Sequence, residues 1–285
     1  MTVTVYTLDS FAKTPQGGNP AGVVLAADEL STEQMLAIAQ RVGFSETAFV
    51  RKSHKADYQV KFFTPSAEVG LCGHATIATF SLLRKKGIIG NGTFSQETRS
   101  GVLNIAVDDD LVYMDQVLPQ YDELVDAKLI VDSLAISPDD CQSDLPAQIV
   151  STGIRDIMVA VKDANMLAAI RPDYDKITKI SQKYNVVGMH VFCLKTRQAT
   201  TVQCRNFAPL FGIDEEAATG TSNGALACYL HKYGIGNEAP FEFIFEQGYS
   251  MGKPSEILAR LTVEAGVIRR IQVGGRAIFR KEISL

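Results

Sequence analysis

One glutamate is the side chain best suited to moving a proton in this sequence. Glu46 lies at the start of an apolar run, within the segment GFSETAFV of residues 43–50. Desolvation at such a place raises a carboxyl pKa toward a value useful for proton transfer. Ser45 and Thr47 beside it could form hydrogen bonds that orient the carboxylate. We interpret Glu46 as a candidate general base; the alternative is a solvent-exposed glutamate at the start of a strand.

The loop CGH at residues 72–74 opens a predicted helix and carries two further reactive groups. The positive end of the helix dipole favours the neutral imidazole of His74, which could then shuttle or donate a proton. The same field should lower the pKa of the Cys72 thiol, which makes it a second candidate base. The alternative for His74 is a capping or structural histidine.

A second loop of this kind, TGT at residues 219–221, follows the acidic run at 214–216. The first N–H groups of a helix have no partner within it and attract anions. We therefore expect Gly73 and Gly220 to hold a carboxylate in one cleft; the alternative is that both glycines only permit close helix packing. Glu216 either serves the helix dipole or reaches into the cleft as a carboxylate partner of the imidazole.

The two loops belong to an internal repeat. The first copy reads GHATIATFSLLRKKGI from Gly73, and the second reads GTSNGALACYLHKYGI from Gly220. Both run through small and apolar residues, turn basic and close on Gly-Ile. This pattern predicts two buried helices of about three turns, each with glycine at its C′ position.

The repeat extends upstream through a Gly-led strand, a helix and two strands in each half. Residues 31–43 combine a capping box, an apolar stripe and a terminal glycine, and their counterpart is a helix predicted at 173–184. The predicted strands are 18–25, 46–51 and 58–63 in the first half, and 153–160, 189–195 and 200–206 in the second. The order β-α-β-β-α thus recurs at an offset of about 147 residues, reduced to about 144 upstream.

Two features break this symmetry. The second-half segment that corresponds to Glu46, residues 187–191, carries no acid, which makes the glutamate a specialisation of the first half. Cys72 is matched by Thr219, so a racemase built on paired cysteines would lack its second thiol. Both differences favour a site with one base.

Composition limits the classes of function. The chain has 285 residues, which suits two domains, and its net charge of -4 argues against a nucleic-acid partner. No apolar run approaches the ~20 residues of a membrane span, and the N-terminus lacks a signal-peptide pattern, so we expect a cytoplasmic protein. The five cysteines form no CxxC pair, and nucleotide-binding glycine motifs are absent. We therefore expect neither a metal nor a cofactor.

The sequence resembles, over nearly its full length, the PhzF-like family, named for the isomerase of phenazine biosynthesis. The resemblance rests on four blocks in order: GNPAGVV from residue 18, SETAFV around Glu46, FTPSAEVGLCGHATIAT around His74 and EEAATGTSNGAL around Gly220. The chain is more distantly similar by fold to diaminopimelate epimerase, whose two catalytic cysteines would fall near Cys72 and Thr219.

The resemblance implies an α+β fold of two pseudo-symmetric diaminopimelate epimerase-like domains. Each would be a barrel-like sheet around a central helix, with the active site between them. The first domain would span residues 1–118 with a C-terminal strand at about 276–285 and carry the catalytic glutamate, and the second would span 119–275. A homodimer and an isomerase that needs no cofactor are also implied.

The family's roles carry over to single residues. The glutamate that moves a proton between substrate carbons falls on Glu46, its supporting histidine on His74, and the substrate-contacting glycines on Gly73 and Gly220. The phenazine isomerase has aspartate at the position of Glu216, and the extra methylene could move the carboxylate by more than about an ångström. We assign Glu216 to the catalytic group as well. The other expected substrate-binding residues are Asn19, Ser45, Cys72 and Thr221, the last of which replaces a family serine.

The sequence thus predicts a cofactor-independent isomerase that acts on a small carboxylate-containing metabolite. Glu46 would act as general base and then as general acid. Two alternatives stay open: an epimerase or racemase that uses Cys72 as a base, and a non-catalytic metabolite-binding protein that keeps the scaffold.

Overall fold

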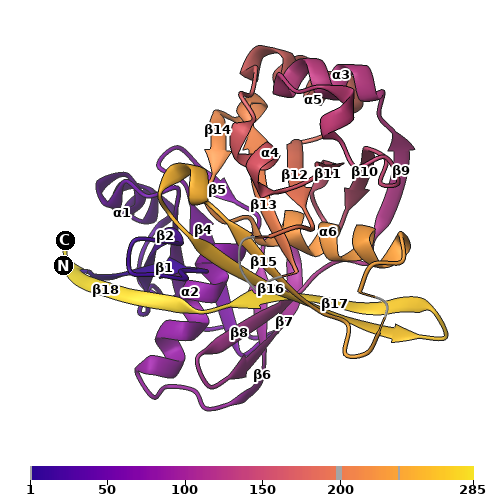
Figure 1. Ribbon diagram of the computed structural model, residues 1–285. Helices are drawn as coiled ribbons and strands as arrows, with labels where there is room; N and C mark the ends of the chain where they lie inside the picture. The colour runs from indigo at the N-terminus through magenta and orange to yellow at the C-terminus, as the bar shows by residue number, and fades with distance from the viewer. Residues whose placement is uncertain (1, 197–200, 237) are drawn as a thin grey trace. The chain divides into compact units, whose positions relative to one another are not determined.

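A computed structural model describes residues 2–196, 201–236 and 238–285, which form an α+β protein. The chain divides into two compact units: unit 1 comprises Met1–Asp115 and Gly274–Leu285, and unit 2 comprises Gln116–Val273 (Figure 1). None of the helices in the described ranges is long and apolar enough to cross a bilayer.

Unit 1 contains two helices among the described residues, with strands before, between and after them. In chain order its elements are β1 (Thr4–Ser10), β2 (Asn19–Val24), α1 (Thr32–Val42), β3 (Glu46–Arg51), β4 (Tyr58–Phe63), β5 (Glu68–Val69), α2 (Gly73–Lys85), β6 (Gly92–Thr98), β7 (Gly101–Asp108), β8 (Leu111–Asp115) and β18 (Ala277–Ser284).

Unit 2 contains more helices. Its elements are β9 (Gln120–Leu124), α3 (Ala127–Leu134), η1 (Pro138–Asp140), β10 (Gln148–Ser151), β11 (Arg155–Ala160), α4 (Ala164–Ala169), α5 (Tyr174–Tyr184), β12 (Gly188–Cys193), β13 (Val202–Ala208), η2 (Pro209–Phe211), β14 (Ile213–Glu216), α6 (Gly220–Lys232), β15 (Glu242–Gln247), η3 (Tyr249–Met251), β16 (Ser255–Glu264) and β17 (Val267–Gly275), whose last two residues belong to unit 1.

The two units have the same strand topology. In unit 1, β1 pairs antiparallel with β18 and β2, β2 pairs parallel with β3, and β3 pairs antiparallel with β4. Strand β4 then pairs antiparallel with β5 and parallel with β6. Unit 2 repeats each step: β10 with β9 and β11, β11 with β12, β12 with β13, and β13 with β14 and β15. The internal repeat is therefore a repeat of topology.

A central helix lies buried against the inner face of the sheet in each unit. Nine of the thirteen residues are buried in both α2 and α6. A helix buried on all sides belongs in the interior of a fold. Helix α2 contacts the strands at both ends of the unit 1 order, among them β18, β1, β7 and β8, so the sheet curves around it like a barrel.

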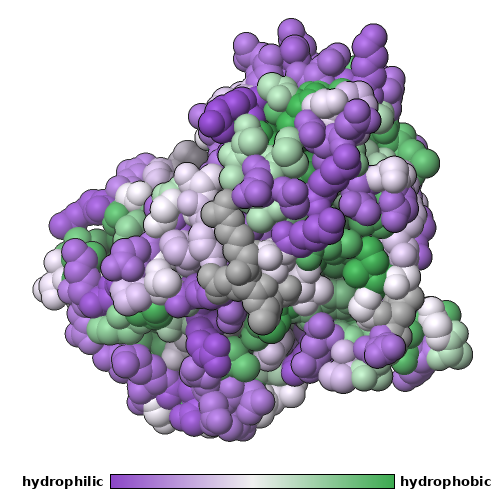
Figure 2. Space-filling view, viewed as in Figure 1, coloured by the Kyte–Doolittle hydropathy of each residue, from purple (hydrophilic) through white to green (hydrophobic). Residues whose placement is uncertain are grey.

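The outer face of each sheet carries the amphipathic helices. Helix α1 packs through Met35, Ile38 and Ala39 against this face in unit 1. In unit 2, α3, α4 and α5 cover the side of β10–β13 that faces away from α6 (Figure 1). Hydrophilic residues dominate the surface around α3 and α5 in the upper part of Figure 2, as expected for helices whose apolar side faces a core.

The predicted elements of the repeat are confirmed. Helix α1 has the capping box at Ser31, and α5 begins after the N-cap Asp173. Both central helices end on a glycine with positive φ, Gly87 and Gly234, and each has the hydrogen bond from the next isoleucine N–H to a leucine carbonyl five residues earlier. Strands β3 and β4 have the predicted bounds, whereas β12 and β13 begin at Gly188 and Val202. Residue 200, the predicted start of the last strand, lies outside the described residues.

Strand register identifies the residue of unit 2 that stands in the place of Glu46. Thr47 pairs with Phe63, and Met189 pairs with the matching Phe207, so Gly188 corresponds to the glutamate. A Cβ on Gly188 would lie 1.8 Å from the carbonyl oxygen of Phe207. Unit 2 therefore has no room for a carboxylate at this position.

We predict that Gly188→Ala lowers the free energy of unfolding by at least about 3 kcal/mol, because backbone must move to relieve the overlap. Gly90→Ala is the matched control, since a Cβ there meets nothing within 4 Å. Its effect should stay within about 0.5 kcal/mol. Urea unfolding of the two variants measures both values, and equal stabilities would contradict the register.

Candidate active site

Strand periodicity brings three polar residues to the N-terminus of α2 in unit 1. Side chains of a strand alternate between its two faces. Ala48 and Val50 pack on the side of the sheet that faces α2, so Glu46, two residues earlier, lies on that side too. Ser10 and Asn19 occupy the same face at the adjoining ends of β1 and β2, where they pair with each other. Parallel pairing of β2 with β3 places Glu46 at that same end.

His74, the second residue of α2, is the centre of this group. Its Nε2 lies 3.2 Å from Glu46 Oε2 and 3.4 Å from Ser45 Oγ. Its Nδ1 lies 3.4 Å from Asn19 Nδ2 and 3.4 Å from Cys72 Sγ. The structure thus brings four predicted site residues together around the imidazole ring of a fifth, His74, with Gly73 in the same loop.

The Glu46 carboxylate is mostly buried, yet its hydrogen-bonding capacity is not fully used. Its side chain is 21% exposed, against 8% for His74. Its Oε2 atom is buried and lies 3.2 Å from His74 Nε2, which leaves it capacity for a further hydrogen bond. A buried carboxylate oxygen with spare hydrogen-bonding capacity can accept a proton from a ligand.

The pKa of Glu46 is shifted in the opposite direction from the one expected from its sequence position. Burial raises this pKa, as predicted, but hydrogen bonding and the charge of His74, together with Ser45 and Cys72, outweigh burial and hold it below its usual range. The carboxylate is therefore ionised at neutral pH. The predicted direction was wrong because His74, Ser45 and Cys72 outweigh desolvation, and the position of Glu46 in the sequence does not reveal these partners.

The expectations for His74 and Cys72 also need correction. Burial lowers the pKa of His74, but the Cys72 sulfur and the Glu46 carboxylate raise it well above its usual value, which favours an imidazolium rather than the neutral ring. Burial raises the pKa of the Cys72 thiol, so the lowered value expected at a helix N-terminus is wrong. Cys72 is also the N-cap of α2 and makes no side-chain capping bond.

Gly73 leaves open space at the start of α2. A Cβ at this position would meet only the Cε of Met114, at 3.6 Å, an ordinary contact. Close packing inside the folded chain therefore does not require this glycine. The first N–H groups of the helix point out of its end without intrahelical partners, which suits an anionic ligand.

Glu46, Cys72 and His74 are also the described residues that could ligate a cation, since one donor atom from each lies within 4.8 Å of the others. A thiol must lose its proton to bind a metal. Burial raises the pKa of Cys72 and so opposes that loss. The arrangement suits proton transfer better than metal binding.

The remaining predicted residues lie in unit 2, at the N-terminus of α6. The hydroxyl of Thr219, the N-cap, donates to Glu216 Oε2 at 2.7 Å. Gln247 Nε2 donates to the backbone oxygen of Glu216 at 2.7 Å and to Thr219 Oγ1 at 3.0 Å. Gly220 and Thr221 follow as the first two residues of the helix.

Below these residues lies a buried network that the sequence did not reveal. The Ser222 hydroxyl donates to Asp156, and Asn206 Nδ2 contacts Ser222 Oγ at 3.4 Å and His190 Nδ1 at 3.1 Å. His190 Nε2 lies 3.2 Å from Asn223 Oδ1. Burial lowers the pKa of His190 to about 4 and raises that of Asp156. The His190 imidazole is therefore neutral, in contrast to that of His74 in unit 1.

Two functional contacts were missed for lack of a local signal. The Ser10 hydroxyl donates to the backbone oxygen of His74 at 2.6 Å and so fixes the first turn of α2. Asp156 pairs with Gly188 as Ala21 pairs with Glu46, so unit 2 does have an acid, one strand away from the expected place. In both cases the partners are distant in sequence, and alternation in an assigned strand would have been the only clue.

Comparison with known proteins gives consistent results. The family model described as phenazine biosynthesis-like protein matches residues 8–282. An uncharacterized isomerase, YfhB, of Bacillus subtilis is 33% identical over 96% of both chains. A trans-2,3-dihydro-3-hydroxyanthranilate isomerase of Pseudomonas chlororaphis is 30% identical over 95% of both.

Solved structures agree with this. The crystal structure of a PhzF family phenazine biosynthesis protein from Bacillus anthracis matches with a TM-score of 0.91 and 31% identity, covering 100% of this chain and 99% of that one. A hydroxyproline epimerase from Agrobacterium vitis matches with a TM-score of 0.63 at 14% identity, covering 100% and 92%. The second likeness concerns the fold alone and is consistent with the diaminopimelate epimerase-like fold expected from the sequence.

The His74–Glu46 pair predicts a two-sided dependence of stability on pH. The pKa of Glu46 is lowered by folding, so its contribution is present above its unfolded pKa of about 4.5 and is lost as the pH falls through the folded value. The pKa of His74 is raised by folding, so its contribution is present below about 6.5 and is lost as the pH rises through the folded value.

We expect the stability difference between wild type and His74→Asn to shrink steadily as the pH rises above about 6.5. Urea midpoints measured from pH 5 to 10 test this. A constant difference between wild type and His74→Asn would contradict the imidazolium assignment.

Proposed function

Because the chain belongs to the PhzF family of isomerases, we propose that it isomerises a small carboxylate-containing metabolite by proton transfer through Glu46. The observation that carries this proposal is the ionised carboxylate of Glu46, which lies beside His74 at the N-terminus of α2 and has an oxygen with spare hydrogen-bonding capacity.

The proposed reaction moves one proton between two carbons. Glu46 removes a proton from the first carbon, the C–H electron pair shifts into the adjoining unsaturated system, and an O–H bond forms on the carboxyl group. The same carboxyl group then gives the proton to a second carbon, as a general acid. No electrons enter or leave the substrate, so the reaction as written needs no redox cofactor.

The lowered pKa of Glu46 limits the substrate class. A carboxylate of low basicity removes a proton only from a carbon whose C–H bond is already activated. We therefore propose a substrate in which the reacting carbon lies next to a double bond or carbonyl group. The dihydro ring of trans-2,3-dihydro-3-hydroxyanthranilate, named for the Pseudomonas chlororaphis relative, belongs to this class.

The α2 N-terminus is the proposed binding site for the substrate carboxylate. The first N–H groups and the positive dipole end of a helix attract anions, and the space in front of Gly73 lets a ligand approach the backbone. His74 would hold the Glu46 carboxylate in place, and Ser10 and Asn19 would hold His74. At the N-terminus of α6, we propose that Gly220 and Thr221 bind a second polar group of the substrate and that Glu216 assists the proton transfer carried out by Glu46.

The structure supports the Glu46 carboxylate, rather than the Cys72 thiol, as the base. Burial raises the pKa of Cys72, so its thiol already carries its proton at neutral pH and is not available as a base. Its counterpart at the head of α6 is Thr219. We propose that Cys72 shapes the site and supports His74 without abstracting a proton.

Glu46→Gln should lower the rate of proton exchange into substrate by at least about a thousandfold, because the amide is not a base. The measurement is deuterium uptake from D₂O by a panel of small carboxylic acids that includes trans-2,3-dihydro-3-hydroxyanthranilate, followed by NMR. Glu68→Gln, another unit 1 carboxylate outside the site, should keep wild-type rates. Unchanged exchange in Glu46→Gln would refute the proposal.

Cys72→Ala should change the same rate by less than about tenfold, because the thiol is not the proton acceptor. Circular dichroism checks that the variant folds. A folded Cys72→Ala protein without any exchange activity would instead support the epimerase-type mechanism with a thiol base.

A further inference from the structure

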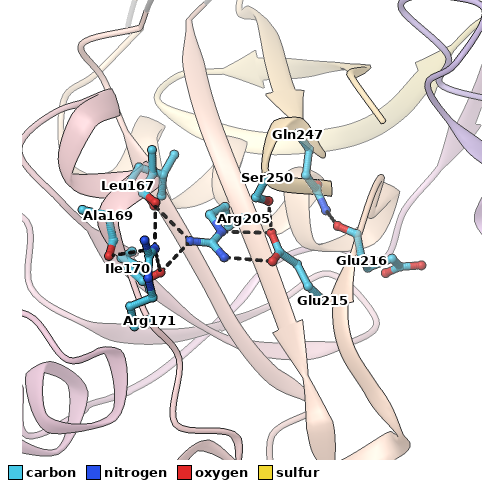
Figure 3. Close-up of polar contacts among 10 residues, drawn as sticks. Leu167, Ala169, Ile170, Arg171, Arg205, Glu215, Glu216, Gln247 and Ser250 are labelled. Atoms are coloured by element: carbon cyan, nitrogen blue, oxygen red, sulfur yellow. Dashed lines mark hydrogen bonds and ion pairs between the residues drawn. The ribbon is translucent and has the colours of Figure 1, made fainter. Parts of the chain in front are cut away.

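Arg205 on β13 has a guanidinium group buried in unit 2 and almost fully hydrogen-bonded. Its Nε and Nη2 donate to the two carboxylate oxygens of Glu215, each at 2.9 Å. Its Nη1 donates to the backbone oxygens of Leu167 and Ile170, at 3.2 and 3.1 Å (Figure 3). The bidentate contact to Glu215 and the two carbonyl contacts fix the guanidinium on three sides.

This contact restrains the acidic segment that follows η2. Breaking a buried ion pair leaves an uncompensated charge, so a bidentate pair of this kind holds its partner firmly. The hydroxyl of Ser250 also donates to Glu215 (Figure 3). Glu215 is therefore fixed to β13 on one side and to η3 on the other.

Fixing Glu215 also fixes the direction of Glu216. Successive side chains of a strand point to opposite sides. Figure 3 shows the Glu216 carboxylate pointing away from Arg205, while its backbone oxygen accepts from Gln247. That carboxylate accepts from the Thr219 hydroxyl at the head of α6. A rotation of β14 would break these contacts together.

Strand β14 is short and lies at the surface of unit 2. It has four residues, and its residues are exposed or half-buried. Its pairing with β13 joins Asn206 to Glu216 and Ala208 to Ile213, with an irregularity between them. Phe211, just before the strand, is 62% exposed. Hydrophobic packing therefore contributes little to its position.

The corresponding ion pair of unit 1 is weaker. Val69 pairs with Phe62 as Glu216 pairs with Asn206, so Lys61 and Glu68 are the counterparts of Arg205 and Glu215. Lys61 Nζ lies 3.7 Å from Glu68 Oε1, and their side chains are 25% and 20% exposed, against 10% and 11% in unit 2. An ammonium group cannot make the bidentate contact of a guanidinium. The tighter pair thus occurs in the unit in which the next residue is a carboxylate rather than valine.

We propose that Arg205 is a positioning residue of the enzyme, which holds Glu215 so that Glu216 presents its carboxylate at the head of α6. The functional half of this inference rests on the proposed function, in which Glu216 takes part in proton transfer. The structural half, the orientation of Glu216 by Arg205, does not depend on it.

The structural test is an NMR titration of the Glu216 carboxyl group in protein labelled with ¹³C glutamate, with Glu216→Gln used to assign the signal. Arg205→Lys keeps the positive charge but removes the guanidinium group and with it the bidentate contact to Glu215. We expect it to shift the Glu216 titration midpoint and to speed backbone deuterium exchange in residues 213–219 about tenfold or more. Lys61→Arg, which also keeps the charge at the corresponding position of unit 1, should alter neither quantity. An unchanged titration in Arg205→Lys overturns the proposal.

Glu215→Gln is the second variant, for use if Arg205→Lys does not fold. It removes the charge of the partner and keeps its shape, and the same two changes are expected. The same two changes in either folded variant support the positioning role, and an unchanged Glu216 titration contradicts it.

The functional test is a double-variant comparison on any acid of the panel whose deuterium exchange depends on Glu46. Arg205→Lys should lower kcat about as much as Glu216→Gln does, and the double variant should be no slower than Glu216→Gln alone. Multiplying effects would show that Arg205 acts elsewhere and would overturn the inference. Exchange that does not depend on Glu46 would instead refute the proposed function, while the NMR titration still decides the orientation of Glu216.

Discussion

The site in unit 1 depends on the contact between His74 Nε2 and the Glu46 carboxylate, which are 3.2 Å apart. Both groups are largely buried, and a buried charge without a partner costs several kcal/mol, on the order of the stability of a small domain. Each group therefore depends on the other. Parallel pairing of β2 and β3 places the carboxylate, the central position of α2 places the imidazole, and Ser10 fixes the helix turn that carries it.

The two units share a scaffold and differ in the charges that they bury. Where unit 1 has Glu46, unit 2 has Gly188, whose surroundings exclude any side chain. Unit 2 instead buries Asp156, held by Ser222, and a neutral His190. These groups stabilise the first turn of α6 without an imidazolium. We infer that duplication of one fold supplied two similar helix N-termini, and that only the first carries the base.

Local signals in the sequence predicted much of the fold. The capping box at Ser31 and the terminal glycines Gly87 and Gly234 act within a few residues, so their effects can be read directly from the chain. The residues that gather around His74 were also expected from the loop and the family blocks. Their roles in catalysis stay predictions.

Contacts between distant segments account for what the sequence did not predict. The pKa directions of Glu46, His74 and Cys72 depend on one another across a sheet and a helix, and dipole or burial arguments made for each residue alone gave the wrong sign. The most direct test of the account is the fate of the proton. With substrate that carries deuterium at the carbon that loses it, a single carboxyl base predicts product that retains part of the label at low conversion. Product free of label, formed while the recovered substrate is still fully labelled, would show that the proton taken from the first carbon is not the one delivered to the second, and would contradict the account.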